Sequence, residues 1–193
     1  LVILHNISTN NRSLMNELNT NNQPYLIIQA AINENLPGLK INSSYNKQNE
    51  TEALLNKNFT LFNLSDELKN FIKDFPAVNT HFGNYIVSPG ANSLLFQKIG
   101  VVETENPLIL FNDNSGRKTG IMAFDGIWRW KLRDYAEHKN HILFNELISK
   151  TVQYLAVKAD KSFFRLMTNK IITENENIEF NAEVYNQSYQ LVT

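Results

Sequence analysis

Residues 119–130 read TGIMAFDGIWRW, and this stretch is the most informative local pattern in the chain. Its first half, 119–124, is an apolar run of strand length. The pair Asp125 and Gly126 follows, and an Asp-Gly pair is typical of a turn. Both tryptophans of the chain lie just after this pair, with Arg129 between them. The stretch therefore predicts a buried strand that ends in a turn carrying Trp-Arg-Trp.

The neighbouring apolar runs place this strand in a sheet. Residues 107–111 (PLILF) precede it, and the connector 112–118 is rich in turn formers and too short for a crossover helix. We therefore expect an antiparallel hairpin. Two more continuous apolar runs, 1–4 and 25–31, flank a short helical pattern, as is typical of a parallel sheet covered on both faces. The sequence predicts an α/β fold, a three-layer α/β/α sandwich with a mostly parallel sheet and an antiparallel hairpin near the C-terminal side.

Two further helices are predicted from capping residues and apolar periodicity. Ser65 is a candidate N-cap for a helix that begins with two acidic residues, and Asn140 is a candidate cap for a helix over 141–157. Between the apolar run 25–31 and Ser65, the pattern of apolar residues is weaker. There we expect a long loop over 32–52 and a strand at 59–62.

The character of the sequence changes after residue 158. Pieces such as 162–166 and 183–185 are short and strand-like, with polar alternation and no helix among them. This pattern predicts two domains, an α/β domain over 1–158 and the start of a truncated β-module over 159–193. The chain also opens on an apolar run without an initiator methionine, so we expect it to be a piece of a longer protein.

The composition removes several classes of function. The chain has no cysteine, which excludes disulfides, thiolate zinc sites and every mechanism with a cysteine nucleophile. A net charge of −1 argues against a surface for nucleic acid. No glycine-rich phosphate-binding motif is present, and His138 and His141 lack the carboxylates that would complete a metal site. We therefore predict no cofactor, no metal and no nucleic-acid partner.

Membrane contact is predicted only through segments outside this sequence. A transmembrane helix needs about 20 consecutive apolar residues, and no run in the chain reaches that length.

One family resemblance runs through the central stretch. The path from Gly116-Arg117-Lys118 to the Trp-Arg-Trp element and on to the helix 141–157 resembles class I glutamine amidotransferase-like domains of large bacterial membrane-associated proteins of unknown function. The resemblance covers about residues 1–160. The tail is similar to the first strands of an immunoglobulin-like module that follows such domains.

The resemblance implies a flavodoxin-like α/β architecture for the first domain and an immunoglobulin-like module for residues 159–193. It does not imply amidotransferase activity. That reaction needs a cysteine nucleophile, and the chain has neither a cysteine nor a Gly-x-Ser-x-Gly elbow that could replace it.

Five residues form the candidate site for a ligand or a partner. Asp125, Trp128, Arg129 and Trp130 are expected just past the end of one strand and His5 at the end of another. Ligands bind at the carboxyl ends of strands in open α/β sheets. An arginine between two indoles can bind a carboxylate or phosphate, or stack on a ring. In the alternative interpretation the tryptophans close the end of the sheet and the arginine binds a carboxyl group or a backbone carbonyl.

Two hypotheses for function follow. The first is a non-catalytic structural or interaction domain of a larger bacterial cell-envelope protein, in its extracytoplasmic (periplasmic), membrane-anchored part. Its partners would be other domains of the parent chain and envelope proteins. The alternative is a small-molecule-binding, glycan-binding or hydrolytic domain that uses the strand-end rim, the edge of the sheet at which these strands end. A deep polar pocket joining His5, Asp125 and Arg129 would favour the alternative, whereas tryptophans sealing the rim would favour the first.

Overall fold

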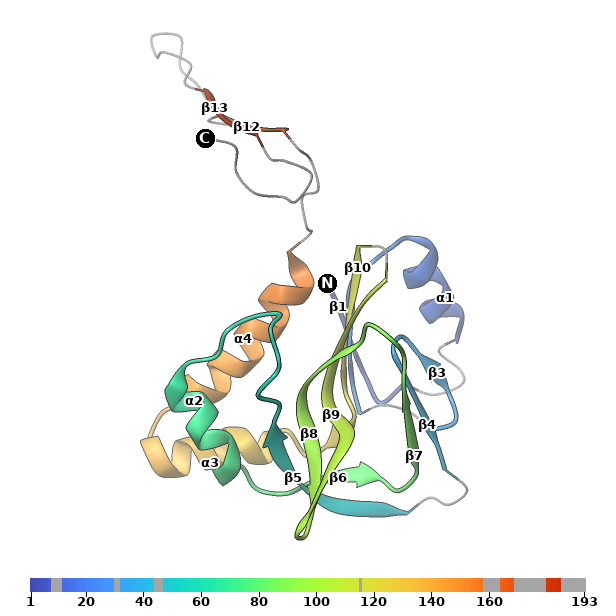
Figure 1. Ribbon diagram of the computed structural model, residues 1–193, viewed down its shortest axis with the longest axis vertical. Coiled ribbons are helices and arrows are strands. Elements are labelled where there is room, and N and C mark those ends of the chain that lie inside the picture. The colour runs from blue at the N-terminus through green and yellow to red at the C-terminus, as the bar shows by residue number, and fades with distance from the viewer. Residues whose placement is uncertain are drawn as a thin grey trace. The chain divides into compact units, whose positions relative to one another are not determined.

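The computed structural model describes residues 1–7, 12–29, 32–43, 47–114, 116–157, 164–168 and 180–184. The chain divides into two compact units, Leu1–Val157 and Lys158–Thr193. The first unit is built on an eight-stranded sheet with the order β1-β2-β10-β9-β8-β5-β6-β11 (Figure 1). Its strands are β1 (Val2–His5), β2 (Tyr25–Ile28), β5 (Gln48–Leu55), β6 (Val78–His81), β8 (Asn92–Ile99), β9 (Val102–Asn114), β10 (Arg117–Met122) and β11 (Phe124–Asp125).

The sheet is mixed, so the prediction of a mostly parallel sheet was wrong. Among the described strands, β1 and β10 each pair with β2 in parallel, and the remaining pairings of this sheet are antiparallel. The reason is the length of the connections. Only Gly100 and Val101 separate β8 from β9, and so short a link can join only antiparallel neighbours. The predicted hairpin is confirmed as β9 and β10.

Helices cover one face of the sheet, and a helix beside a small sheet covers the other (Figure 1). The first face packs against α2 (Asp66–Phe71), its 3₁₀ extension η2 (Ile72–Asp74), α3 (Trp128–His138) and α4 (Ile142–Ala156). The second face packs against α1 (Arg12–Thr20) and a three-stranded sheet of β3 (Asn35–Leu36), β4 (Leu39–Asn42) and β7 (Asn84–Val87).

Neighbouring strand residues alternate between the two apolar cores. Leu26 and Met122 belong to the core under the helices, whereas Ile27 and Ile121 belong to the core under α1 and the small sheet. The predicted α/β class is confirmed. The predicted helical layer on both faces is not, because β3, β4 and β7 cover part of the second face.

The region between residues 32 and 64 differs from its prediction. The expected loop contains β3, β4 and the start of β5, and the expected strand 59–62 is not a strand. Phe59 and Phe62 instead pack their rings against Phe111, at centroid distances of 5.8 and 5.4 Å. The true strand, β5, buries Thr51 and Ala53. Its buried side is too polar and too small for an apolar pattern to reveal it.

The capped helices were predicted correctly. The Ser65 hydroxyl accepts a hydrogen bond from the Leu68 amide at 3.1 Å, which caps α2. The Asn140 side chain accepts one from the Ile142 amide at 2.9 Å at the start of α4. No helix in the described ranges has the length and hydropathy that a bilayer crossing requires.

The second unit is described by one strand pair. β12 (Phe164–Thr168) and β13 (Phe180–Val184) are antiparallel. The other strands expected after residue 158 lie outside the described residues, and the immunoglobulin-like assignment stays a prediction.

Candidate functional site

The Trp-Arg-Trp element is the first turn of helix α3, not the turn that the sequence predicted. Gly126 adopts a φ of 101°, which lets the chain leave β11 and enter the helix within three residues. A Cβ atom at this position would lie 3.4 Å from Nε of Arg129, whose side chain folds back over the glycine. This local geometry fixes where the two tryptophans point.

Trp130 points inward and is fully buried. Its ring stacks on Phe75 with a centroid distance of 4.7 Å and an interplanar angle of 7°, and it lies 4.7 Å from the Phe124 ring. The indole Nε1 donates a hydrogen bond to the Pro76 carbonyl at 2.9 Å. Trp130 therefore joins α3 to the end of η2 and to β11, whereas Trp128, which the structural interpretation also placed at the closed end of the sheet, is mostly exposed.

Arg129 also binds the backbone. Its Nη1 donates to the Ala77 carbonyl at 2.9 Å, and its guanidinium carbon lies 5.6 Å from the centre of the Trp128 ring. The guanidinium thus ties α3 to the segment before β6. It is not aimed at a pocket that also contains the other candidate residues.

Asp125 and His5 lie apart from this cluster. Asp125 lines a narrow hollow with Gln48 and His81, and this hollow includes neither His5 nor Arg129. The hollow is too small to hold a ligand. His5 is exposed at the end of β1, an outer strand of the sheet, in register with Ile28 of β2. The structure therefore places Arg129 against Trp128, points Trp130 into the core and leaves Asp125 and His5 outside this group.

His81 is the titratable group that burial perturbs in this hollow. Its Nδ1 is buried without a hydrogen-bond partner in the described part of the chain, and burial lowers the pKa of His81 from its ordinary value of 6.5. Because the folded pKa is lower, the unfolded chain takes up a proton first as the pH falls. The contribution of His81 to stability is thus fully present above about pH 6.5 and is lost as the pH falls toward its folded pKa.

We expect His81→Gln to flatten part of this pH dependence. Urea unfolding of both proteins between about pH 7.5 and pH 5 measures it, because the glutamine has no proton to gain in that window. The free energy of unfolding of the natural protein should fall more steeply than that of the variant. The prediction would be contradicted if the free energies of unfolding of the two proteins fell equally with pH. It would have the wrong sign if that of the variant fell more steeply.

The outer side of α3 is apolar. Trp128, Leu132 and Tyr135 are 59%, 57% and 51% exposed and are spaced by four and three residues, so they share one side of the helix. The Tyr135 ring lies 5.3 Å from the His141 ring, and Ile142, 66% exposed, follows directly at the start of α4. We call the surface formed by Trp128, Leu132, Tyr135 and Ile142 the α3 face.

The inner side of α3 is held by a buried carboxylate that sequence reasoning missed. Asp134 is fully buried, and its Oδ1 lies 2.8 Å from Nδ1 of His138. Its Oδ2 accepts a hydrogen bond from the Phe144 amide in the first turn of α4 at 2.9 Å. One side chain therefore binds its own helix and caps the next. The signal that could have found it is the spacing of four residues between Asp134 and His138.

The residues that the structure describes contain no group of three or more His, Asp or Glu side chains that could hold a metal ion.

Comparisons with models of known families, with curated proteins and with solved structures found no match to this chain. The resemblance to glutamine amidotransferase-like domains stays a prediction based on sequence pattern.

Proposed function

We propose that residues 1–157 form a non-catalytic interaction domain that binds an acidic, apolar segment of a protein through the α3 face. The observation that carries this proposal is the division of α3 into two sides. Trp130 and Asp134 hold the helix on the domain, while Trp128, Leu132 and Tyr135 face solvent. Exposed apolar patches of this kind mark interaction sites, and tryptophan and tyrosine are enriched at such sites.

The chemistry of the partner follows from the charges around the α3 face. Lys131 and Lys139 are exposed beside it, and of the two carboxylates of α3, Asp134 is buried and Glu137 is exposed. Arg133 is largely balanced by Glu137, with 3.2 Å between their charged atoms. The surface is therefore apolar with a positive border, which fits a segment that carries Asp or Glu beside its apolar side chains.

The wider context is the parent protein. We propose that this chain is an amidotransferase-like domain without its nucleophile, within the extracytoplasmic part of a larger bacterial cell-envelope protein. Support comes from the missing cysteine and from the pattern that runs from Gly116 to Trp130. Under this proposal the acidic segment belongs to another domain of the parent chain or to an envelope protein.

A hydrolytic role at the strand-end rim has less support. Asp125 lies in a hollow too small for a substrate, and the Arg129 guanidinium binds a backbone carbonyl.

Photocrosslinking tests the proposed interface. The photoreactive residue p-benzoylphenylalanine replaces Leu132 in the parent protein. In a control variant it replaces Val101. Val101 is 94% exposed in the turn between β8 and β9, far along the chain from α3. We expect crosslinks from position 132, and not from position 101, to a peptide rich in Asp or Glu and apolar residues.

A synthetic copy of that peptide then gives the energetics. Trp128→Ala should weaken its binding by about thirtyfold or more, because tryptophan is a frequent binding hot spot. Lys131→Ala with Lys139→Ala should mainly reduce the dependence of binding on salt. Crosslinks equal at both positions would overturn the proposal. So would a crosslinked peptide that binds Trp128→Ala as tightly as the natural chain, or crosslinks to lipid in place of protein.

A further inference from the structure

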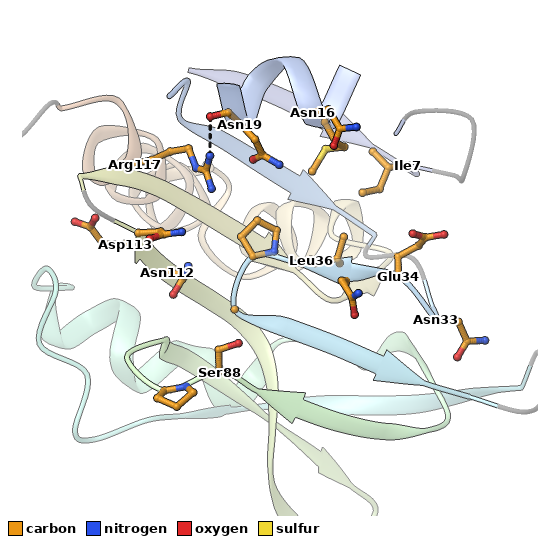
Figure 2. A pocket seen from close by; sticks show the side chains of 16 residues that line it. Ile7, Asn16, Asn19, Asn33, Glu34, Leu36, Ser88, Asn112, Asp113 and Arg117 are labelled. Atoms are coloured by element: carbon orange, nitrogen blue, oxygen red, sulfur yellow. Dashed lines mark hydrogen bonds between the residues drawn. The ribbon is translucent and has the colours of Figure 1, made fainter. Parts of the chain in front are cut away.

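A polar cleft opens on the face of the sheet that α1 and the small sheet cover (Figure 2). Its volume is about 770 Å³, within the range of small-molecule sites. Side chains reach it from Ile7 and α1, from the β3–β4 hairpin, from Ser88 and Pro89 after β7, and from the adjoining ends of β9 and β10. The cleft is separate from the α3 face, which lies on the helices of the opposite side.

Carboxamide groups give the cleft unused hydrogen-bonding capacity. The side chains of Asn16, Asn35 and Asn112 line it and make no hydrogen bond with the described part of the chain. Each carboxamide can donate two hydrogen bonds and accept others. In contrast, the Asn33 side chain is already bonded to the backbone of Ser43 through both its oxygen and its nitrogen. The three unused carboxamides come from three different elements and surround one space.

The charges in the cleft are nearly balanced. Arg117 is the cation among its lining residues, and Nη1 of its guanidinium donates to the Asn19 carbonyl at 3.0 Å (Figure 2). The carboxylates of Glu34 and Asp113 line the same cleft, and Oδ1 of Asp113 accepts a hydrogen bond from the Gly116 amide at 2.8 Å. One positive and two negative groups disfavour phosphate and other strong anions. The arginine also disfavours a compact cation.

Apolar surface lies between these polar groups. Met15, Leu36 and Pro37 contribute to the lining beside the carboxamides. Such a mixture suits a ligand with hydroxyl groups at its rim and C–H groups on its faces. Neutral saccharides combine these features without charge.

The wall formed by the β3–β4 hairpin is fixed in place. Gly38 has a φ of 86°, and a Cβ atom there would lie 2.9 Å from Cβ of Asn112, so the hairpin backbone packs directly on β9. The Ser88 amide donates a hydrogen bond to the Gly38 carbonyl at 3.0 Å, which joins the hairpin to the end of β7. A wall built in this way is formed before a ligand arrives, which reduces the entropic cost of binding.

We infer that the polar cleft binds a neutral saccharide through the carboxamides of Asn16, Asn35 and Asn112. This inference does not depend on the α3 face.

The test uses the 193-residue chain and titration calorimetry with neutral disaccharides, namely maltose, cellobiose and N,N′-diacetylchitobiose. Glucose 6-phosphate and glucosamine serve as charged comparisons. We expect at least one disaccharide to bind and both charged sugars to bind more weakly. Asn16→Leu and Asn112→Leu should each reduce its affinity about tenfold, as the loss of one good hydrogen bond predicts.

Two controls separate the site from the fold. Asn70→Leu changes an exposed asparagine on α2, outside the cleft, and should leave binding unchanged. Circular dichroism melting of each variant shows whether it is folded, and little change is expected because the two cleft carboxamides make no hydrogen bond to other described residues. Absence of binding at about 10 mM of every neutral disaccharide would overturn the inference. So would binding that survives both cleft variants, or a preference for either charged sugar.

Discussion

Trp130→Ala is expected to lower the free energy of unfolding by about 3–5 kcal/mol, the usual cost of removing a large buried aromatic side chain. The ring is fully buried between Phe75 and Phe124, so its loss leaves a cavity under α3. The variant also leaves the Pro76 carbonyl without the indole donor. Urea unfolding followed by circular dichroism measures the change.

The matched control for this variant is two residues away. Trp128 is mostly exposed, so Trp128→Ala should change the free energy of unfolding by no more than about 0.5 kcal/mol. Both variants remove the same side chain from the same turn of the same helix, and they differ in burial and in the hydrogen bond to Pro76. Equal losses in the two variants, or a larger loss for Trp128→Ala, would contradict the proposed division of α3 into an inner and an outer side.

The second large effect is expected for Asp134→Ala, at about 2–4 kcal/mol, which combines a lost helix cap with a lost buried hydrogen bond to His138. The carboxylate is fully buried and accepts from both His138 and the Phe144 amide. Its removal leaves the amide unsatisfied at the start of α4 and separates two helices that it now joins. Thermal and urea unfolding monitored at 222 nm measure the loss.

Two further variants distinguish hydrogen bonding from volume. Asp134→Asn keeps the shape and one acceptor oxygen, so it should lose about half as much stability as the alanine variant. Glu137→Ala removes a carboxylate of the same helix that forms only a surface pair with Arg133, and its effect should stay within about 0.5 kcal/mol. If Asp134→Ala behaved like Glu137→Ala, the buried network would not hold α3 on α4.

Much of the fold could be predicted because its signals are local. One signal is the apolar runs that form β1, β2, β9 and β10. The other is the capping residues Ser65 and Asn140, which lie just before the helices that they predict. The direction of most strand pairings depends on which distant segments meet, and apolar runs alone do not carry that information. β5 was missed because its buried side chains are Thr51 and Ala53.

Helix α3 was missed for a different reason. Its periodic apolar residues face solvent, while its buried side contains Asp134, so the pattern is the reverse of an ordinary amphipathic helix. Without the helix, Trp128 and Trp130 are equivalent neighbours in a turn. In a helix, residues two apart point to nearly opposite sides, which is what separates their roles.

The polar cleft could not be predicted from sequence. Asn16, Asn35 and Asn112 lie far apart in a chain with many asparagines, and each one alone is typical of a loop or a turn. Only the packing of α1 and the β3–β4 hairpin on the sheet brings them together.

Hydroxyl-radical footprinting of the two tryptophans tests the central claim most directly, because it reports which indole meets solvent and whether a partner covers it. Oxidation is quantified by mass spectrometry in the isolated 193-residue chain and in the larger envelope protein to which we propose that it belongs, here called the parent protein. We predict that Trp128 is oxidised rapidly in the isolated chain and is protected severalfold in the parent protein, while Trp130 is protected in both. Equal oxidation of Trp128 in the two samples, or rapid oxidation of Trp130 in the isolated chain, would contradict the account.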